Sequence, residues 1–185
     1  MMTNVFLYGS SGTGKTIVSA ETVKIKLSQF KSINKPVKVI ITQFTPREND
    51  ILMKNFKEKH FCEMDISICS LKMLSESLDI DFDYQHPKKM IEEVVNKLSE
   101  RKEMTILLCD ELFSCDTEGQ KTPDWSDMRT ADNVVWILAL RPDSGSRETT
   151  NLIEPRDANV HVTKGGYHLC LEIKRDKCNT ILTVF

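Results

Sequence analysis

Residues 9–16, GSSGTGKT, are the first in the chain whose types and spacing suit a chemical task. They fit the pattern Gly-x-x-x-x-Gly-Lys-Ser/Thr, in which glycines let the backbone curl until successive N–H groups point at a phosphate chain. The N-terminus of a following helix adds partial positive charge. In such a loop the Lys15 ammonium reaches the β- and γ-phosphates, and the Thr16 hydroxyl binds Mg²⁺. We therefore predict a nucleoside triphosphate site formed by Gly9, Ser10, Ser11, Gly12, Thr13, Gly14, Lys15 and Thr16.

A pair of carboxylates follows an apolar run in the middle of the chain. Asp110 and Glu111 stand at the carboxyl end of a strand-like segment, within ILLCDEL. In a parallel sheet that end opens on the same side as the phosphate loop, where ligands sit. We predict that Asp110 holds Mg²⁺ through its water shell and that Glu111 orients and deprotonates the attacking water. The alternative is that both carboxylates only cap the next helix.

Arg141 directly follows the apolar segment NVVWILAL. If that strand lies between the phosphate-loop strand and the strand that ends at Asp110, Arg141 lies near the γ-phosphate. A cation there stabilises the charge of the transition state. A solvent-facing arginine at the start of the loop 141–150 is the other reading, and it stays open. Arg147, deeper in that loop, is expected at the surface.

The segments that must position these residues alternate between strand-like and helix-like patterns. Apolar or β-branched runs predict strands over 4–8, 37–43, 65–70, 104–110 and 133–140, while helices are predicted over 16–30, from about 48 to 60, and from Pro87 onward. The alternation predicts an α/β fold with a mainly parallel sheet, formed by one domain over residues 1–185. Around Lys164-Gly165-Gly166, segment 159–173 predicts a hairpin at the sheet edge, with a ligand-contacting loop as the alternative.

Composition restricts the classes of partner. The chain has 25 Lys and Arg against 27 Asp and Glu, and this near balance predicts no strong overall attraction to nucleic acid or to anionic membranes. We expect no secretory signal and no membrane span. The six cysteines form no Cys-x-x-Cys pair, so we expect reduced thiols and a cytoplasmic or nuclear location. Asp79, Asp81 and Asp83 lack the spacing of an EF-hand loop and predict an acidic, solvent-facing connector.

The order of the motifs resembles the first motor domain of superfamily-one helicases, which are P-loop NTPases. GSSGTGKT resembles the phosphate loop of that family, VIITQFTPRENDILMKNF its next motif, and ILLCDEL its Asp-Glu motif. ISICSLKML and VVWILALRP are similar to its weaker motifs. The resemblance implies a three-layer RecA-like fold, ATP with Mg²⁺, and contact of Thr42 or Thr45 with single-stranded nucleic acid. It also implies that Arg175, in HLCLEIKRDKCNTI, reaches the γ-phosphate.

The chain departs from that family at several places. Phe113 stands where the family has Gln in Asp-Glu-x-Gln, and Arg141-Pro142 replaces the Gln expected after WILAL. Only three residues precede the first strand. We therefore expect the upstream glutamine motif that reads adenine to be absent, and we expect no second motor domain after Phe185. This chain alone is therefore not expected to unwind nucleic acid.

From these residues we predict Mg²⁺-dependent binding and hydrolysis of ATP by a stand-alone domain. The alternative is a nucleotide-dependent switch or protein-interaction module with little or no turnover, in which occupancy orders loop 141–150. The partner could be single-stranded nucleic acid or a protein. We expect no membrane partner. The Asp-Glu pair suits water activation and argues against a kinase. The choice between adenine and guanine stays open.

Overall fold

A computed structural model describes residues 4–8, 15–33, 35–43, 54, 57–59, 61, 66–83, 85–113, 128–141, 160–163, 166–175 and 180–184. The description covers the backbone alone for Tyr8, Glu111, Phe113, Arg141 and the residues from 160 onward.

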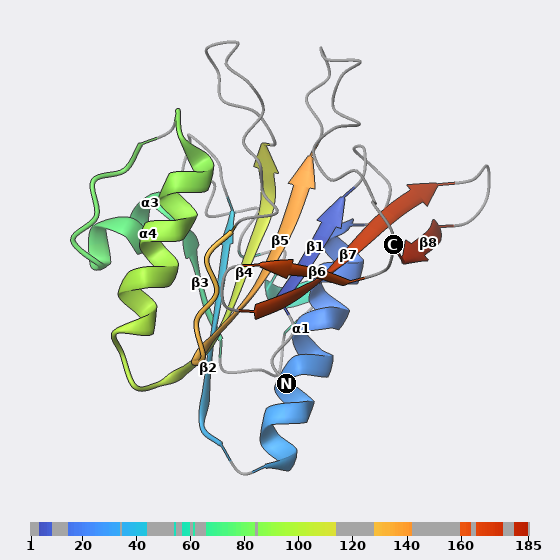
Figure 1. Cartoon of the computed structure of the whole chain (residues 1–185), viewed down its shortest axis with the longest axis horizontal. Helices are drawn as coiled ribbons and strands as arrows, with labels where there is room; N and C mark the ends of the chain where they lie inside the picture. The colour runs from blue at the N-terminus through green and yellow to red at the C-terminus, as the bar shows by residue number, and fades with distance from the viewer. Residues whose placement is uncertain are drawn as a thin grey trace.

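The described strands form one eight-stranded sheet, in the order β3-β2-β4-β5-β1-β7-β6, with β8 also paired to β7 (Figure 1). Strands β1 to β5 and β7 run parallel, and β6 and β8 pair with β7 in the antiparallel sense. The strand bounds are β1 (Asn4–Tyr8), β2 (Val37–Gln43), β3 (Ser67–Ser70), β4 (Met104–Phe113), β5 (Val134–Arg141), β6 (Val160–Thr163), β7 (Gly166–Arg175) and β8 (Thr180–Val184). The predicted parallel sheet and C-terminal hairpin are therefore confirmed, the hairpin being β6 and β7.

Helices cover both faces of the sheet and complete three layers. Helix α1 (Lys15–Ser32) packs on one face, where Ala20, Val23, Leu27 and Phe30 join one buried core cluster. Helices α3 (Leu71–Ser77) and α4 (Pro87–Ser99) pack on the other face, in a second cluster (Figure 1). Lys54, residues 57–59 and Phe61 are also helical, and the rest of the helix predicted from about 48 to 60 lies outside the described residues. The predicted three-layer α/β fold with a mainly parallel sheet is confirmed.

Helix α4 forms as its sequence predicts. Pro87 occupies the first turn, where a missing N–H costs nothing, and the expected apolar face is fully buried: Met90, Ile91, Val94, Val95 and Leu98. Helix α3 was not predicted. The Ser70 hydroxyl caps its start by accepting from the Met73 N–H at 3.2 Å, and Leu71, Leu74 and Leu78 provide the buried stripe. The seven residues of α3 directly follow β3, so the sequence of this segment looks like a continuation of the strand and does not indicate a separate helix.

A buried side chain fixes the position of β1 against β5. Asn4 is 4% exposed, and its Oδ1 accepts a hydrogen bond of 3.0 Å from the Trp136 backbone N–H. The Trp136 indole donates in turn to the Arg129 carbonyl at 2.9 Å, and its ring packs against Phe6 with centroids 4.8 Å apart. The Asn4 amide thus extends the β1–β5 ladder by one bond and sets where the end of β1 lies relative to its neighbour.

Replacing Asn4 with Ala should therefore lower the free energy of unfolding by about 1–3 kcal/mol, because the buried Trp136 N–H loses its acceptor. Urea denaturation followed by circular dichroism measures the change. Asn96→Ala is the matched control, because Asn96 Oδ1 accepts no hydrogen bond in the described part of the chain. An equal effect of the two substitutions would contradict the role given to Asn4.

Among the described side chains, Cys69 and Cys109 are free thiols, as expected. Cys109 is fully buried, and burial raises the pKa of its thiol to about 12. An unfolded thiol has a pKa of about 8.5. Because the folded state retains a proton that the unfolded state loses, the contribution of this thiol to stability is complete below the unfolded pKa. It disappears as the pH rises toward the folded value.

Between about pH 8.5 and pH 10, the free energy of unfolding should fall more steeply in the wild type than in Cys109→Ala, by up to about 1.4 kcal/mol per pH unit. Denaturation curves at several pH values compare the two slopes. Alanine is a suitable replacement because the Thr42 hydroxyl, which contacts Cys109 Sγ at 3.2 Å, still has the Leu108 carbonyl as acceptor. Identical slopes would show that the thiol titrates normally in the fold.

Candidate nucleotide site at the carboxyl edge of the sheet

The start of α1 lies at the carboxyl edge of the sheet, after β1 and the glycine-rich segment. Lys15 is the first residue of this 18-residue helix and is 8% exposed. Gly9, Ser10, Ser11, Gly12, Thr13 and Gly14 lie outside the described residues, so their contacts with phosphate stay predictions. An anion at this helix end would meet the partial positive charge of the helix N-terminus.

Thr16 and Asp110 meet across the fold. The Thr16 hydroxyl donates to Asp110 Oδ2 at 3.1 Å, although the two residues are 94 positions apart in the sequence. Asp110 is 1% exposed, whereas the Thr16 side chain is half-buried. The contact ties the first turn of α1 to the end of β4, and it places a hydroxyl and a carboxylate oxygen at one point.

Strand β4 has an irregularity at the predicted carboxylate pair. Cys109 pairs with Leu138 and Leu112 with Leu140, so β4 has one residue more than β5 between these two pairs. Such a bulge bends a strand and re-aims its side chains, and bulges are frequent beside active sites. Cys109 and Leu112 both pack in the cluster on the α4 side, while Asp110 contacts α1. Glu111 lies in the bulge beside Asp110, and its role as a base stays a prediction.

Strand β5 lies between β1 and β4, which is the condition under which Arg141 was expected near the γ-phosphate. Arg141 is the last residue of β5 and pairs with Phe113. Arg175 ends β7, three positions after Glu172, the register partner of Tyr8. The backbones of both arginines thus lie at the edge where β1 and β4 end, and their contacts with phosphate stay predictions.

The donor set of Thr16 and Asp110 fits a bound magnesium ion. Mg²⁺ prefers oxygen ligands, usually keeps several waters, and is held by one or two carboxylates together with substrate phosphates. A hydroxyl and a carboxylate 3.1 Å apart supply two such oxygens. The hydroxyl could bind the ion directly and the carboxylate could accept hydrogen bonds from its waters, which leaves most of the octahedral shell to phosphate oxygens and water. Arg147 and the loop 142–150 lie outside the described residues.

The prediction that Thr42 contacts nucleic acid is wrong for its side chain. Thr42 is 0% exposed, and its Oγ1 lies 3.2 Å from the Leu108 carbonyl and 3.2 Å from Cys109 Sγ. Its hydroxyl therefore joins β2 to β4 inside the core. Thr45, the other residue that the resemblance implied, lies outside the described residues.

Sequence reasoning did not single out Gln43, which the fold brings to the same edge. Gln43 is the last residue of β2 and is in register with Asp110 of β4. The signal available was a polar residue ending the predicted strand 37–43. Strand order, which makes Gln43 a neighbour of Asp110, cannot be read from that segment.

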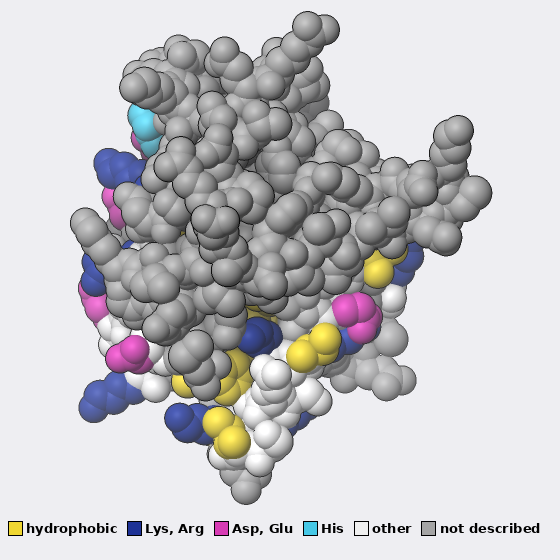
Figure 2. Space-filling view, turned by 45° about the vertical axis from the view of Figure 1, so that its right-hand side comes forward, with side chains coloured by type: hydrophobic (Ala, Val, Ile, Leu, Met, Phe, Trp, Pro, Cys, Tyr) yellow, Lys and Arg dark blue, Asp and Glu magenta, His cyan; other side chains and the backbone are white. Residues whose placement is uncertain are grey.

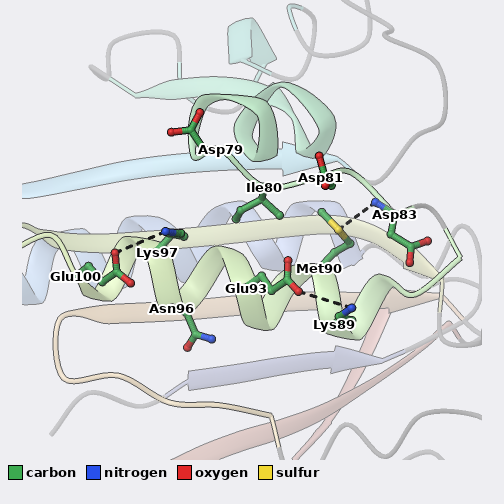
Figure 3. Close-up of a pocket in the computed structure, with 10 residues that line it drawn as sticks. All are labelled: Asp79, Ile80, Asp81, Asp83, Lys89, Met90, Glu93, Asn96, Lys97 and Glu100. Atoms are coloured by element: carbon green, nitrogen blue, oxygen red, sulfur yellow. Dashed lines mark hydrogen bonds and ion pairs between the residues drawn. The ribbon is translucent and has the colours of Figure 1, made fainter.

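A cleft of about 590 Å³ lies elsewhere, over the exposed side of α4. Figure 3 shows its lining, in which Asp79, Asp81 and Asp83 of the connector before α4 face side chains of that helix. Asp79 and Asp81 are exposed, as predicted for a solvent-facing connector. Hydrogen bonds from His86 and from the Gln85 backbone lower the pKa of Asp83. This cleft belongs to the face opposite α1 and does not include the Thr16–Asp110 contact.

Large exposed apolar side chains in the described residues include Ile17 and Ile25 on α1 and Ile33 just after it. The space-filling view shows apolar side chains interspersed with charged and other polar ones (Figure 2). Scattered exposure of this kind is common on protein surfaces and requires no partner. Within the described ranges, no helix is both long and apolar enough to cross a membrane.

Comparisons with known proteins give only a distant likeness. No family model and no curated protein matches the sequence. Among solved structures, the chain is similar to the Orc1 protein of Aeropyrum pernix, determined in complex with DNA, with a TM-score of 0.41 and 18% identity. The match covers 91% of this chain and 39% of that chain. A likeness at this level says nothing about what the chain does.

The Thr16–Asp110 contact predicts energetic coupling between the two side chains. Without nucleotide, Thr16→Val should lower the free energy of unfolding by about 1–2 kcal/mol, and by much less when Asp110 is already Ala. A double-mutant cycle by urea denaturation measures this difference. Thr22→Val, on the same helix, is the control, because the Thr22 hydroxyl bonds only the Val18 carbonyl and should show no coupling to Asp110. Additive effects of Thr16 and Asp110 would contradict the contact.

Proposed function

We propose that this chain binds ATP with Mg²⁺ and hydrolyses it at the carboxyl edge of the sheet. The observation that supports the proposal most strongly is the 3.1 Å contact between Thr16 and Asp110. The motif residues at the end of β1 and at the end of β4 each predict half of a metal–phosphate site. A joint site requires a fold that brings both halves together, and the contact between Thr16 and Asp110 supports the proposal for that reason.

Each residue has a distinct role in the proposed site. Backbone N–H groups of residues 9–16 would hold the phosphates, and the Lys15 ammonium would neutralise the β- and γ-oxygens. Thr16 and Asp110 would hold Mg²⁺, Asp110 through the water shell of the ion. Bound there, Mg²⁺ would draw negative charge away from the γ-phosphate and its leaving group. Arg141 or Arg175 would stabilise the charge that develops in the transition state.

Glu111 would act on the attacking water. The water oxygen forms a bond to the γ-phosphorus while the bond from that phosphorus to the β–γ bridging oxygen breaks. The electron pair of the broken bond leaves on ADP, and Glu111 accepts one proton from the water. This use of an adjacent carboxylate favours hydrolysis over transfer to another acceptor. A switch without turnover would use the same binding residues and leave Glu111 idle.

Lys15→Ala should abolish ATP binding and turnover, because nothing else in the motif places a cation on the phosphates. Glu111→Gln should keep ATP affinity within about threefold and lower turnover by about 100-fold or more, since only the base is lost. Titration with labelled ATP and GTP in Mg²⁺, followed by a phosphate-release assay, measures both quantities. Lys31→Ala, an exposed lysine in the last turn of the same helix, is the matched control and should behave as the wild type.

Turnover that persists in Lys15→Ala would refute the proposed site. Tight ATP binding by a wild type that releases no phosphate would favour the nucleotide-dependent switch instead. Measuring turnover with and without single-stranded DNA or RNA then tests whether the chain responds to nucleic acid, as its resemblance to a helicase motor domain implies. Strong stimulation would support a nucleic-acid partner, and an unchanged rate would count against one.

A further inference from the structure

Gln43 stands beside the proposed metal-binding carboxylate. It ends β2 and is in register with Asp110 of β4, and neighbouring strands lie about 4.8 Å apart. Val39 and Ile41 of β2 pack in the same cluster as Ile106 and Leu108 of β4, on the α1 side. Because side chains alternate along a strand, Gln43 shares this face with Asp110, which contacts Thr16 of α1.

Gln43 is also on the side from which a nucleophile would approach. The strand order from the phosphate loop outward is β1, β5, β4, β2, so Gln43 lies beyond Asp110 as seen from β1. In phosphoryl transfer the attacking and leaving oxygens are roughly in line through the phosphorus. If the loop after β1 holds the β-phosphate, the attacking water comes from the direction of β4 and β2.

The chemistry of an amide suits a residue in this place. Gln43 is half-buried, and its side chain makes no hydrogen bond to another side chain in the described part of the chain. An amide presents an acceptor oxygen and two donor hydrogens without adding charge beside the Asp110 carboxylate. The two places where the family resemblance implied a glutamine are occupied by Phe113 and Arg141.

We propose that Gln43 orients the attacking water. Its Oε1 would accept a hydrogen bond from the second O–H of the water, the one whose proton Glu111 does not take, so that a lone pair of the water points at the γ-phosphorus. That second proton stays on the phosphate product. The inference rests on the proposed function and adds a residue that neither motif contains.

Gln43→Leu, which keeps a similar volume, should lower kcat by about 10- to 100-fold and leave the ATP dissociation constant within about twofold. Gln43→Asn, which keeps the amide on a shorter stem, should recover part of the lost kcat. The melting temperature should change little in either variant, because this residue ends its strand and is half-buried. Phosphate release, ATP titration and thermal denaturation give the three readouts. Gln29→Ala, at an exposed position of α1, is the control and should match the wild type.

Wild-type kcat in Gln43→Leu would overturn the inference. So would a fall in kcat accompanied by weaker ATP binding and a lower melting temperature in both variants, because that pattern indicates packing. The wild type and Glu111→Gln are measured in parallel. If the wild type hydrolyses ATP, Glu111→Gln does not, and Gln43→Leu is fully active, only the inference fails. A wild type without turnover refutes the proposed hydrolysis and the inference together.

Discussion

The Thr16 hydroxyl and the Asp110 carboxylate lie 3.1 Å apart, and every functional argument depends on this contact. A phosphate-binding segment at one strand end and an acidic pair at another have no joint chemistry unless the two strands end on the same edge. The contact also orders the buried carboxylate, since Asp110 is 1% exposed and a charge at such a depth requires a partner. A metal ion bound there would add the O–H groups of its water shell as further partners of the carboxylate.

The sheet brings the two residues together through strand order. Because β5 separates β1 from β4, the start of α1 can reach across to the end of β4 and leave the end of β5 between them. Asn4 holds β1 in register with β5, and the bulge after Cys109 lets β4 return Leu112 to the opposite core while Asp110 faces α1. The register of β1 against β5 thus has a functional consequence, because a shift would move the start of α1 away from Asp110.

The sequence patterns predicted most elements, and the gaps have physical reasons. Strand 37–43 was predicted to its exact bounds because five of its seven residues are β-branched, and Pro87 marked the start of α4. Strand order is a property of packing between distant segments, so the neighbourhood of Gln43 and Asp110 had no local signal. The bulge adds one residue at the acidic pair Asp110-Glu111, and no sequence pattern marks such an insertion. A threonine in a strand can face either way, so the burial of Thr42 was not predictable from its motif.

The central claim is that Thr16 and Asp110 together hold the metal of a nucleotide complex. A crystal structure with Mn²⁺ and a non-hydrolysable ATP analogue tests it directly, because the anomalous signal of manganese locates the ion without assumption. The account predicts the ion next to the Thr16 hydroxyl and within one water of the Asp110 carboxylate, with the γ-phosphate on its other side. An ion bound away from these residues, or an analogue bound away from the start of α1, would contradict it.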